Sequence, residues 1–142
     1  MRTFFDENEV QTKNRIELID ISNYVENHIR KSNVKNGFCL AYALHSTVAI
    51  VINEHETGLV QDIINKVEKD FPKGAGWFHD RIDDNANAHL ASTFIGSSRI
   101  FPVKDGRLVR GVWQNIFLLE LDGPRRRKII LETLGECSIG SN

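Results

Sequence analysis

Apolar and polar positions alternate in two short segments near the start of the chain. Residues 2–6 and 15–21 therefore predict strands. Ser22 follows and is expected to cap a helix through its hydroxyl oxygen. Intervals of three and four residues place one face of that helix at Tyr24, Val25, His28 and Ile29. Asn36-Gly37 predicts the end of the helix, because glycine adopts the left-handed conformation without strain.

Two apolar runs occupy the middle of the chain. Residues 38–44 and 47–53 are apolar at both alternating sets of positions, which predicts strands covered on both faces. Apolar residues then repeat at helical spacing from about residue 58 to residue 71. Pro72 and Gly74 predict the end of this second helix, because neither residue favours its continuation.

The rest of the chain combines one long loop, one short helix and several strands. Residues 73–85 form the longest predicted loop, and a short helix follows from about Asn85 to Gly96. Asp105-Gly106 is typical of a tight hairpin turn. The strands around and after it read RIFPV, RLVRGVW, IFLLEL and KIILETL. Strands and helices that do not alternate regularly predict an α+β fold.

Length, charge and cysteine content narrow the class of protein. The 142 residues fit a single domain, residues 1–142. A formal charge of −1 argues against nucleic-acid or anionic-membrane partners, which need a basic excess. Cys39 and Cys137 lack a CxxC partner and are expected to be free thiols in a reducing compartment. With no signal-like segment and no run of about 20 apolar residues, the sequence predicts a cytoplasmic protein.

The stretch of residues 78–96 concentrates polar side chains more than almost any other part of the chain. Its first twelve residues contain two histidines, three aspartates and two asparagines. His79 and His89 are therefore candidates for a metal or phosphate site. The stretch is not a calcium loop, because Ala88 and Phe94 stand where the loop needs glycine and glutamate. It can supply only part of a site.

A third histidine, His45, ends an apolar run and precedes Ser46 and Thr47. A histidine at a strand end projects from a fixed backbone, and neutral imidazole is a good ligand for zinc-like metals. We therefore expect His45 to join His79 and His89. The alternative for each histidine is an ordinary surface or hydrogen-bonded core residue. The carboxylates that could orient or complete such a site are Glu54, Asp62, Asp83 and Asp84.

Three consecutive arginines follow Gly123-Pro124. In a strand, alternation would put Arg125 and Arg127 on one face and Arg126 on the other. Two guanidinium groups on one face would form a phosphate clamp, because each offers forked donors. The alternative is a solvated basic edge that discourages strand aggregation.

Taken together, an ordered set of segments resembles the YjbQ family, also called the secondary thiamine-phosphate synthase family. The resemblance covers residues 15–135. Its segments are His45-Ser46-Thr47, Asn53-Glu54, Asp62, His79, Asp84-Asn85, Ala88-His89-Leu90, Gly96, Asp105-Gly106-Arg107, Gly111, Trp113-Gln114, Glu120, Asp122-Gly123-Pro124-Arg125 and Arg127. Many relatives have threonine where this chain has Ser46, and both residues carry a hydroxyl group.

The resemblance implies a fold, an assembly and a metal. The fold is α+β, with mixed or antiparallel sheets packed as a sandwich or barrel-like core and two to three helices. The assembly is a homotrimer with sites near subunit boundaries. The family's histidine cluster maps onto His45, His79 and His89, with a divalent metal as the expected occupant. Three histidines favour a zinc-like ion, and magnesium is the alternative with a diphosphate substrate.

Three functions follow from the resemblance and the residues. The first is weak thiamine-phosphate synthase activity, which joins a pyrimidine methyl diphosphate to a thiazole phosphate and releases pyrophosphate, with Arg125 and Arg127 as the clamp. The second is a metal-dependent hydrolase of a small phosphorylated substrate, with Glu54 or Asp84 as general base. The third is a non-catalytic trimer that binds a metal or a phosphorylated metabolite.

Overall fold

The structure of the protein, a computed structural model, describes residues 1–137. Its elements follow one another in the order β1 (Arg2–Gln11), β2 (Glu17–Asp20), α1 (Ser22–Ser32), β3 (Asn36–Ala43), β4 (Val48–Asn53), α2 (Thr57–Asp70), the 3-10 turn η1 (Phe78–Arg81), α3 (Ala86–Ile95), β5 (Ser98–Lys104), β6 (Arg107–Leu108), β7 (Asn115–Glu120) and β8 (Arg126–Glu136). Within the described residues no helix is both long and apolar enough to cross a bilayer.

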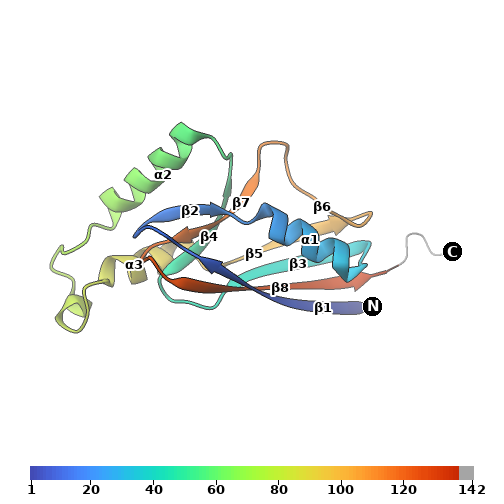
Figure 1. The fold of residues 1–142 in the computed structure, drawn as a ribbon, viewed down its shortest axis with the longest axis horizontal. Helices are drawn as coiled ribbons and strands as arrows, with labels where there is room; N and C mark the ends of the chain where they lie inside the picture. The colour runs from blue at the N-terminus through green and yellow to red at the C-terminus, as the bar shows by residue number, and fades with distance from the viewer. Residues whose placement is uncertain (138–142) are drawn as a thin grey trace.

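The strands form two antiparallel sheets. One sheet has five strands in the order β1-β8-β3-β5-β6, and the other has three in the order β2-β7-β4. Figure 1 shows the smaller sheet and α1 above the larger sheet, with α2 and α3 at the opposite end from the β5–β6 turn. The α+β fold with antiparallel sheets that we predicted is confirmed, and the sheets curl into half a barrel.

The run IFLLEL is almost entirely apolar because it forms most of strand β7, and both faces of this strand are buried. Ile116 and Leu118 point into the core between the two sheets, whereas Leu119 packs against α2 and α3 on the other side. Strand β4 is divided in the same way, with Ile50 in the first core and Ala49 in the second. The three-stranded sheet is thus covered on both faces, as the sequence predicted for residues 47–53.

Strand β3 is covered on one face only, so this part of the sequence prediction is wrong for a single chain. Its buried side chains alternate with large apolar ones that remain open to solvent, and neighbouring strands add more of them. The register places these side chains on the outer face of the five-stranded sheet, which we call the apolar face: Phe5, Phe38, Leu40, Tyr42, Ile100 and Leu134. Phe38 is 59% exposed and Ile100 is 67% exposed.

Two local predictions around α1 are also corrected. Ser22 does not cap the helix, because its hydroxyl accepts a hydrogen bond from the Ile116 amide of β7 at 2.9 Å. The helix ends earlier than predicted, at Asn33, which adopts the left-handed conformation with φ 61°. Asn36-Gly37 instead begins β3.

The hairpin predicted at Asp105-Gly106 is present, but its second strand is short. Both turn residues have positive φ, 51° and 78°, as a two-residue hairpin turn requires. Strand β6 covers only Arg107 and Leu108, so the prediction that the whole segment RLVRGVW forms a strand is wrong. Val112 and Trp113 lie in the exposed loop that follows, 86% and 69% exposed.

Candidate functional site

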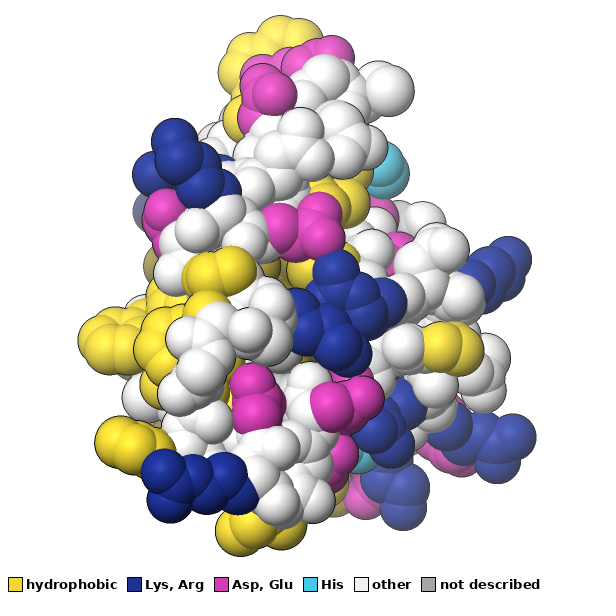
Figure 2. All heavy atoms as spheres, turned by 90° about the vertical axis from the view of Figure 1, so that its left-hand side faces the viewer, with side chains coloured by type: hydrophobic (Ala, Val, Ile, Leu, Met, Phe, Trp, Pro, Cys, Tyr) yellow, Lys and Arg dark blue, Asp and Glu magenta, His cyan; other side chains and the backbone are white. Residues whose placement is uncertain are grey.

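A hollow of about 690 Å³ opens at the end of the molecule that carries α3. It is lined by residues 44–47 between β3 and β4, by Asn85 and His89 at the start of α3, and by Asp122 and the arginines at 125–127 between β7 and β8. We call it the crossover hollow. Figure 2 looks onto this end of the molecule, where Lys and Arg side chains gather near the centre between Asp and Glu side chains.

The topology brings these segments together. Two of the connections between the sheets, from β3 to β4 and from β7 to β8, lie at the same end of the molecule. Backbone hydrogen bonds join them, since the Leu44 amide donates to the Lys128 carbonyl and the Leu121 amide donates to the Thr47 carbonyl, both at 3.2 Å. The site residues at 44–47 and 122–127 therefore sit on a fixed backbone.

A buried ion pair forms the floor of the crossover hollow. Arg127 and Glu120 are 3% and 0% exposed at their side chains, and the guanidinium donates to both carboxylate oxygens. The Thr12 hydroxyl and the Leu121 and Asp122 amides also donate to that carboxylate, at 2.7, 3.0 and 2.9 Å. Burial raises the pKa of the Glu120 carboxyl, but these donors, Arg127 first, outweigh it and hold the pKa below its ordinary value. Both members of the pair are therefore charged at neutral pH.

Arg127 is mostly committed to this floor. Besides Glu120, its Nη2 donates to the Thr47 hydroxyl at 2.8 Å. Among the described residues, Nη1 is the guanidinium nitrogen of Arg127 without a hydrogen bond. Strand β8 begins at Arg126, so Arg125 precedes it and the alternation expected for Arg125 and Arg127 does not apply to both.

The two exposed arginines face the hollow from its rim. The Arg125 Nη2 donates to Asp122 Oδ2 at 3.0 Å, which orients a side chain that is 54% exposed. Arg126 is 72% exposed and lies 3.8 Å from the Glu9 carboxylate. Asp122 also accepts a hydrogen bond from Asn85 Nδ2 at 2.8 Å, so it links the rim to the start of α3.

Asn85 leaves one buried polar atom without a partner in the described part of the chain. Its Oδ1 accepts no hydrogen bond, although the residue is buried and lines the hollow. A buried acceptor without a donor costs free energy unless water or a ligand supplies one. Asn85 and Asp122 are site residues that the sequence analysis named only within the family resemblance and to which it gave no role. Asn85 otherwise marked the start of the short helix.

The three candidate histidines lie at this end but make different contacts. The rings of His79 and His89 meet edge to face, with centroids 4.7 Å apart, and His89 lines the crossover hollow. His45 Nε2 accepts a hydrogen bond from the Lys128 amide at 2.8 Å. Burial lowers the pKa of His45, and the Arg127 charge lowers it further. His45 is therefore neutral near pH 7, with its proton on Nδ1.

These contacts determine which of the three histidines has a ring nitrogen free to coordinate a metal ion. Within residues 1–137, no three side chains of His, Cys, Asp or Glu are grouped as a metal site. His79 and His89 are suited to be a pair of ligands, because they adjoin and none of their ring nitrogens is hydrogen bonded within that range. His45 as oriented does not fit, since its lone pair at Nε2 is occupied by Lys128.

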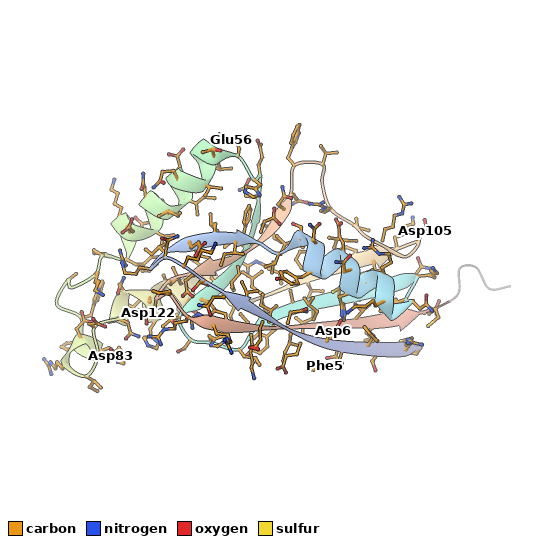
Figure 3. The ribbon with its side chains drawn as sticks, in the orientation of Figure 1. Phe5, Asp6, Glu56, Asp83, Asp105 and Asp122 are labelled. Carbon is orange, nitrogen blue, oxygen red and sulfur yellow. The ribbon has the colours of Figure 1, made fainter. Side chains whose placement is uncertain are left out.

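The structure does not bring the predicted carboxylates to the hollow within one chain. Glu54 follows the end of β4 whereas His45 precedes its start, so the length of β4 separates them, about 20 Å at about 3.4 Å per residue. Figure 3 shows the nearby Glu56 well apart from Asp122. Asp84 is 82% exposed and lies 3.6 Å from Lys73. Asp122 is the carboxylate that lines the hollow.

The amino-acid sequence is similar to a protein family and to several of its members. The family model described as "UPF0047 protein YjbQ-like" matches residues 6–136. A UPF0047 protein of Archaeoglobus fulgidus is 46% identical over 125 residues, which cover 88% of this chain and 97% of that protein. The UPF0047 protein YugU of Bacillus subtilis is 32% identical over 131 residues, which cover 89% and 96%.

Solved structures share the fold over the same length. A YbjQ-like protein of unknown function from Sulfolobus solfataricus has a TM-score of 0.94 and 53% identity, and the match covers 95% of this chain and 99% of that one. An uncharacterised YjbQ/UPF0047 protein from Clostridium acetobutylicum has a TM-score of 0.87 and 33% identity, with 91% and 99% covered.

Proposed function

The chain belongs to the YjbQ-like UPF0047 family, and we propose that it is an enzyme acting on a small phosphorylated metabolite bound in the crossover hollow. One observation supports this most strongly: Arg125 and Arg126 flank an open hollow of about 690 Å³, and the buried Arg127 lies beneath it. Guanidinium groups bind phosphate through paired donors, and a hollow of this size accommodates a small organic molecule.

The reaction we propose is thiamine-phosphate synthesis. The bond between the pyrimidine methylene and its diphosphate breaks, a new bond forms to the thiazole nitrogen, and pyrophosphate leaves with the electron pair. Charge then develops on the diphosphate oxygens, where preorganised cations stabilise it most. Arg125, held by Asp122, is the first of these cations. His45 adds a neutral Nδ1–H donor. The thiazole nitrogen is the nucleophile, so the chain need not provide one.

We further propose that His79 and His89 hold a divalent, zinc-like metal ion beside the hollow, with His45 as a third ligand once it releases the Lys128 amide. A metal there would stabilise negative charge on phosphate oxygens. Magnesium, which prefers oxygen ligands, would enter with the diphosphate instead.

Replacing Arg125 by alanine is expected to weaken pyrophosphate binding by about ten-fold or more, because one charge-assisted contact contributes about 1.5–3 kcal/mol. Turnover of the two thiamine precursors should fall to background in the same variant. Calorimetry measures the first result, and chromatography of thiamine phosphate measures the second. Arg2→Ala removes an exposed arginine outside the hollow and should leave both unchanged.

Two results would change the proposal. Equal affinity and turnover in wild type and Arg125→Ala would remove Arg125 from the clamp. Binding of pyrophosphate by the wild type without turnover of either precursor would contradict the enzyme and leave a metabolite-binding protein.

We propose that the protein assembles as a homotrimer in which the apolar face is buried by further copies. Phe5, Phe38, Ile100 and Leu134 are each at least 45% exposed in one chain, on a single sheet face with a shallow apolar hollow of about 480 Å³. A contiguous apolar surface of this kind marks an interface. Glu54, too far from its own chain's crossover hollow, then remains a candidate base only for a neighbouring copy's hollow.

Light scattering after size exclusion should therefore give the mass of three 16.2 kDa chains for wild type. Phe38→Lys with Ile100→Lys should give monomers, because two buried charges in an apolar contact are costly. The control, Phe78→Lys, changes a side chain that is 79% exposed but lies on η1, and should stay trimeric. A wild-type monomer would overturn the assembly.

A further inference from the structure

A second hollow of about 530 Å³ lies between α1 and the β5–β6 turn. It is lined by Glu26, Arg30, Lys35 and residues 105–108, and we call it the hairpin hollow. Figure 3 shows Asp105, which lines it, at the opposite end of the molecule from Asp122 of the crossover hollow. The two hollows share no lining residue, so substitutions in one leave the lining of the other unchanged.

The walls of the hairpin hollow are fixed to one another. The Gly106 amide donates to the Lys35 carbonyl at 2.9 Å, which ties the turn to the segment between α1 and β3. The Lys35 amide in turn donates to the Glu136 carbonyl of β8 at 2.7 Å. A side chain added at Gly106 would come within 3.3 Å of the Lys35 side chain, which shows how closely the two walls approach. The backbone that carries the lining side chains is thus preorganised.

Charge in this hollow is unbalanced. Arg30, Lys35 and Arg107 make no ion pair with any of residues 1–137. The Glu26 carboxylate is neutralised by Arg110 at 2.9 Å. Asp105 is then the remaining carboxylate of the lining, against three cations. Such an excess at a concave site attracts anions.

Compensation of the α1 dipole explains only part of this cluster. Arg30 lies in the last turn of α1, where a cation interacts favourably with the helix C-terminus. Lys35 follows the helix by three residues and Arg107 belongs to β6, so neither is needed for that purpose. These two cations come from separate elements, and the helix dipole does not account for them.

We propose that the hairpin hollow is a binding site for a small molecule that carries a diphosphate group. Arg30 of α1 and Arg107 of β6 offer forked donors, and Lys35 of the segment between α1 and β3 adds a third positive charge. A volume of about 530 Å³ leaves room beyond the diphosphate for an organic part, which Leu108 contacts. This site is separate from the proposed catalytic site, and binding to it does not require turnover.

The test uses inorganic pyrophosphate as probe and the full-length chain with Arg125→Ala, which weakens pyrophosphate binding in the crossover hollow. Calorimetry should still detect one pyrophosphate per chain. Adding Arg30→Gln and Arg107→Gln should weaken that binding at least ten-fold. The control pair is Lys13→Gln and Lys69→Gln. It also removes two cations that make no ion pair within the described residues, but both lie outside the hairpin hollow. This pair should leave the pyrophosphate affinity unchanged. Amide resonances of Gly106 and Leu108 should shift on titration.

Any of three results would contradict the proposed site. These are the absence of pyrophosphate binding in the Arg125→Ala variant, equal weakening of pyrophosphate binding by both pairs of substitutions, and shifts of amide resonances that lie outside the hairpin hollow. If the Arg30 and Arg107 pair fails to fold, Arg107→Lys, which keeps the charge and loses the fork, must still weaken binding. Loss of this site with intact binding at Arg125 would leave the proposed function standing, and the reverse result would leave the hairpin hollow standing.

Discussion

Replacing Glu120 with alanine is expected to lower the free energy of unfolding by about 3–5 kcal/mol, the usual cost of removing one partner from a buried ion pair. The Arg127 guanidinium would remain 3% exposed without its counter-charge, and the Thr12 hydroxyl would lose an acceptor at 2.7 Å. Urea unfolding at one fixed protein concentration measures the change, because assembly makes stability depend on concentration.

A matched control separates burial from mere loss of an ion pair. Glu7→Ala removes the partner of Lys128, a pair 3.6 Å apart whose side chains are 45% and 52% exposed. Exposed pairs contribute about 0–1 kcal/mol, so this variant should unfold close to the wild type. Comparable losses in both variants would show that Glu120 and Arg127 do not form a buried charged pair.

The same pair makes stability depend on pH in a defined direction. The donors around Glu120 hold its pKa below the ordinary value in the folded protein. Its contribution is therefore fully present above the unfolded-state pKa and is lost as pH falls through the lower folded-state pKa. Glu120→Gln, which cannot ionise, should flatten this part of the acid unfolding curve.

The Glu120–Arg127 pair can also be used to test whether Arg127 takes part in pyrophosphate binding. An apolar replacement of both members, Glu120→Leu with Arg127→Met, should recover much of the stability lost in Glu120→Ala, because no unpaired charge is left buried. Pyrophosphate affinity in this double variant then isolates the part that Arg127 plays as a ligand group. A small change would assign the clamp to Arg125 and Arg126.

The sequence predicted the secondary structure well where one residue type decides the local conformation. Asp105-Gly106 specifies its turn because both positions need positive φ. The apolar run of residues 47–53 predicted a strand covered on both faces, and Ile50 and Ala49 of that strand are buried in two separate cores. Boundaries depend on contacts from other elements, and Ser22 shows this, because the Ile116 amide occupies its hydroxyl.

The candidate site was harder to predict from the sequence, because it depends on where the β3–β4 and β7–β8 connections between the sheets meet. Thr47 and Arg127 are 80 residues apart in the chain, yet their side chains are hydrogen bonded. Alternation placed Arg125 and Arg127 on one face, but a strand that begins one residue later changes that conclusion. Glu54 illustrates the converse: a carboxylate near His45 in sequence lies at the other end of a strand.

The other large effect that we expect concerns the metal. Wild-type protein incubated with zinc and then dialysed should retain about one ion per chain, as a site with three protein ligands would. His79→Ala and His89→Ala should each reduce retention to background, because a single remaining histidine of the pair cannot hold the ion. Elemental analysis by mass spectrometry gives the metal content directly and does not depend on turnover.

His45 and His55 make this experiment discriminating. His55→Ala removes a histidine that is 52% exposed and paired with Asp20 at 2.8 Å, outside the crossover hollow, so it should retain zinc like the wild type. His45→Ala should lose zinc only if the ring releases the Lys128 amide and turns toward the His79–His89 pair. Equal zinc in wild type, His79→Ala and His89→Ala would remove the metal from the proposal. The arginine rim would then have to bind and orient the phosphorylated substrate without it, because Arg125 and Arg126 depend on none of the three histidines for their positions.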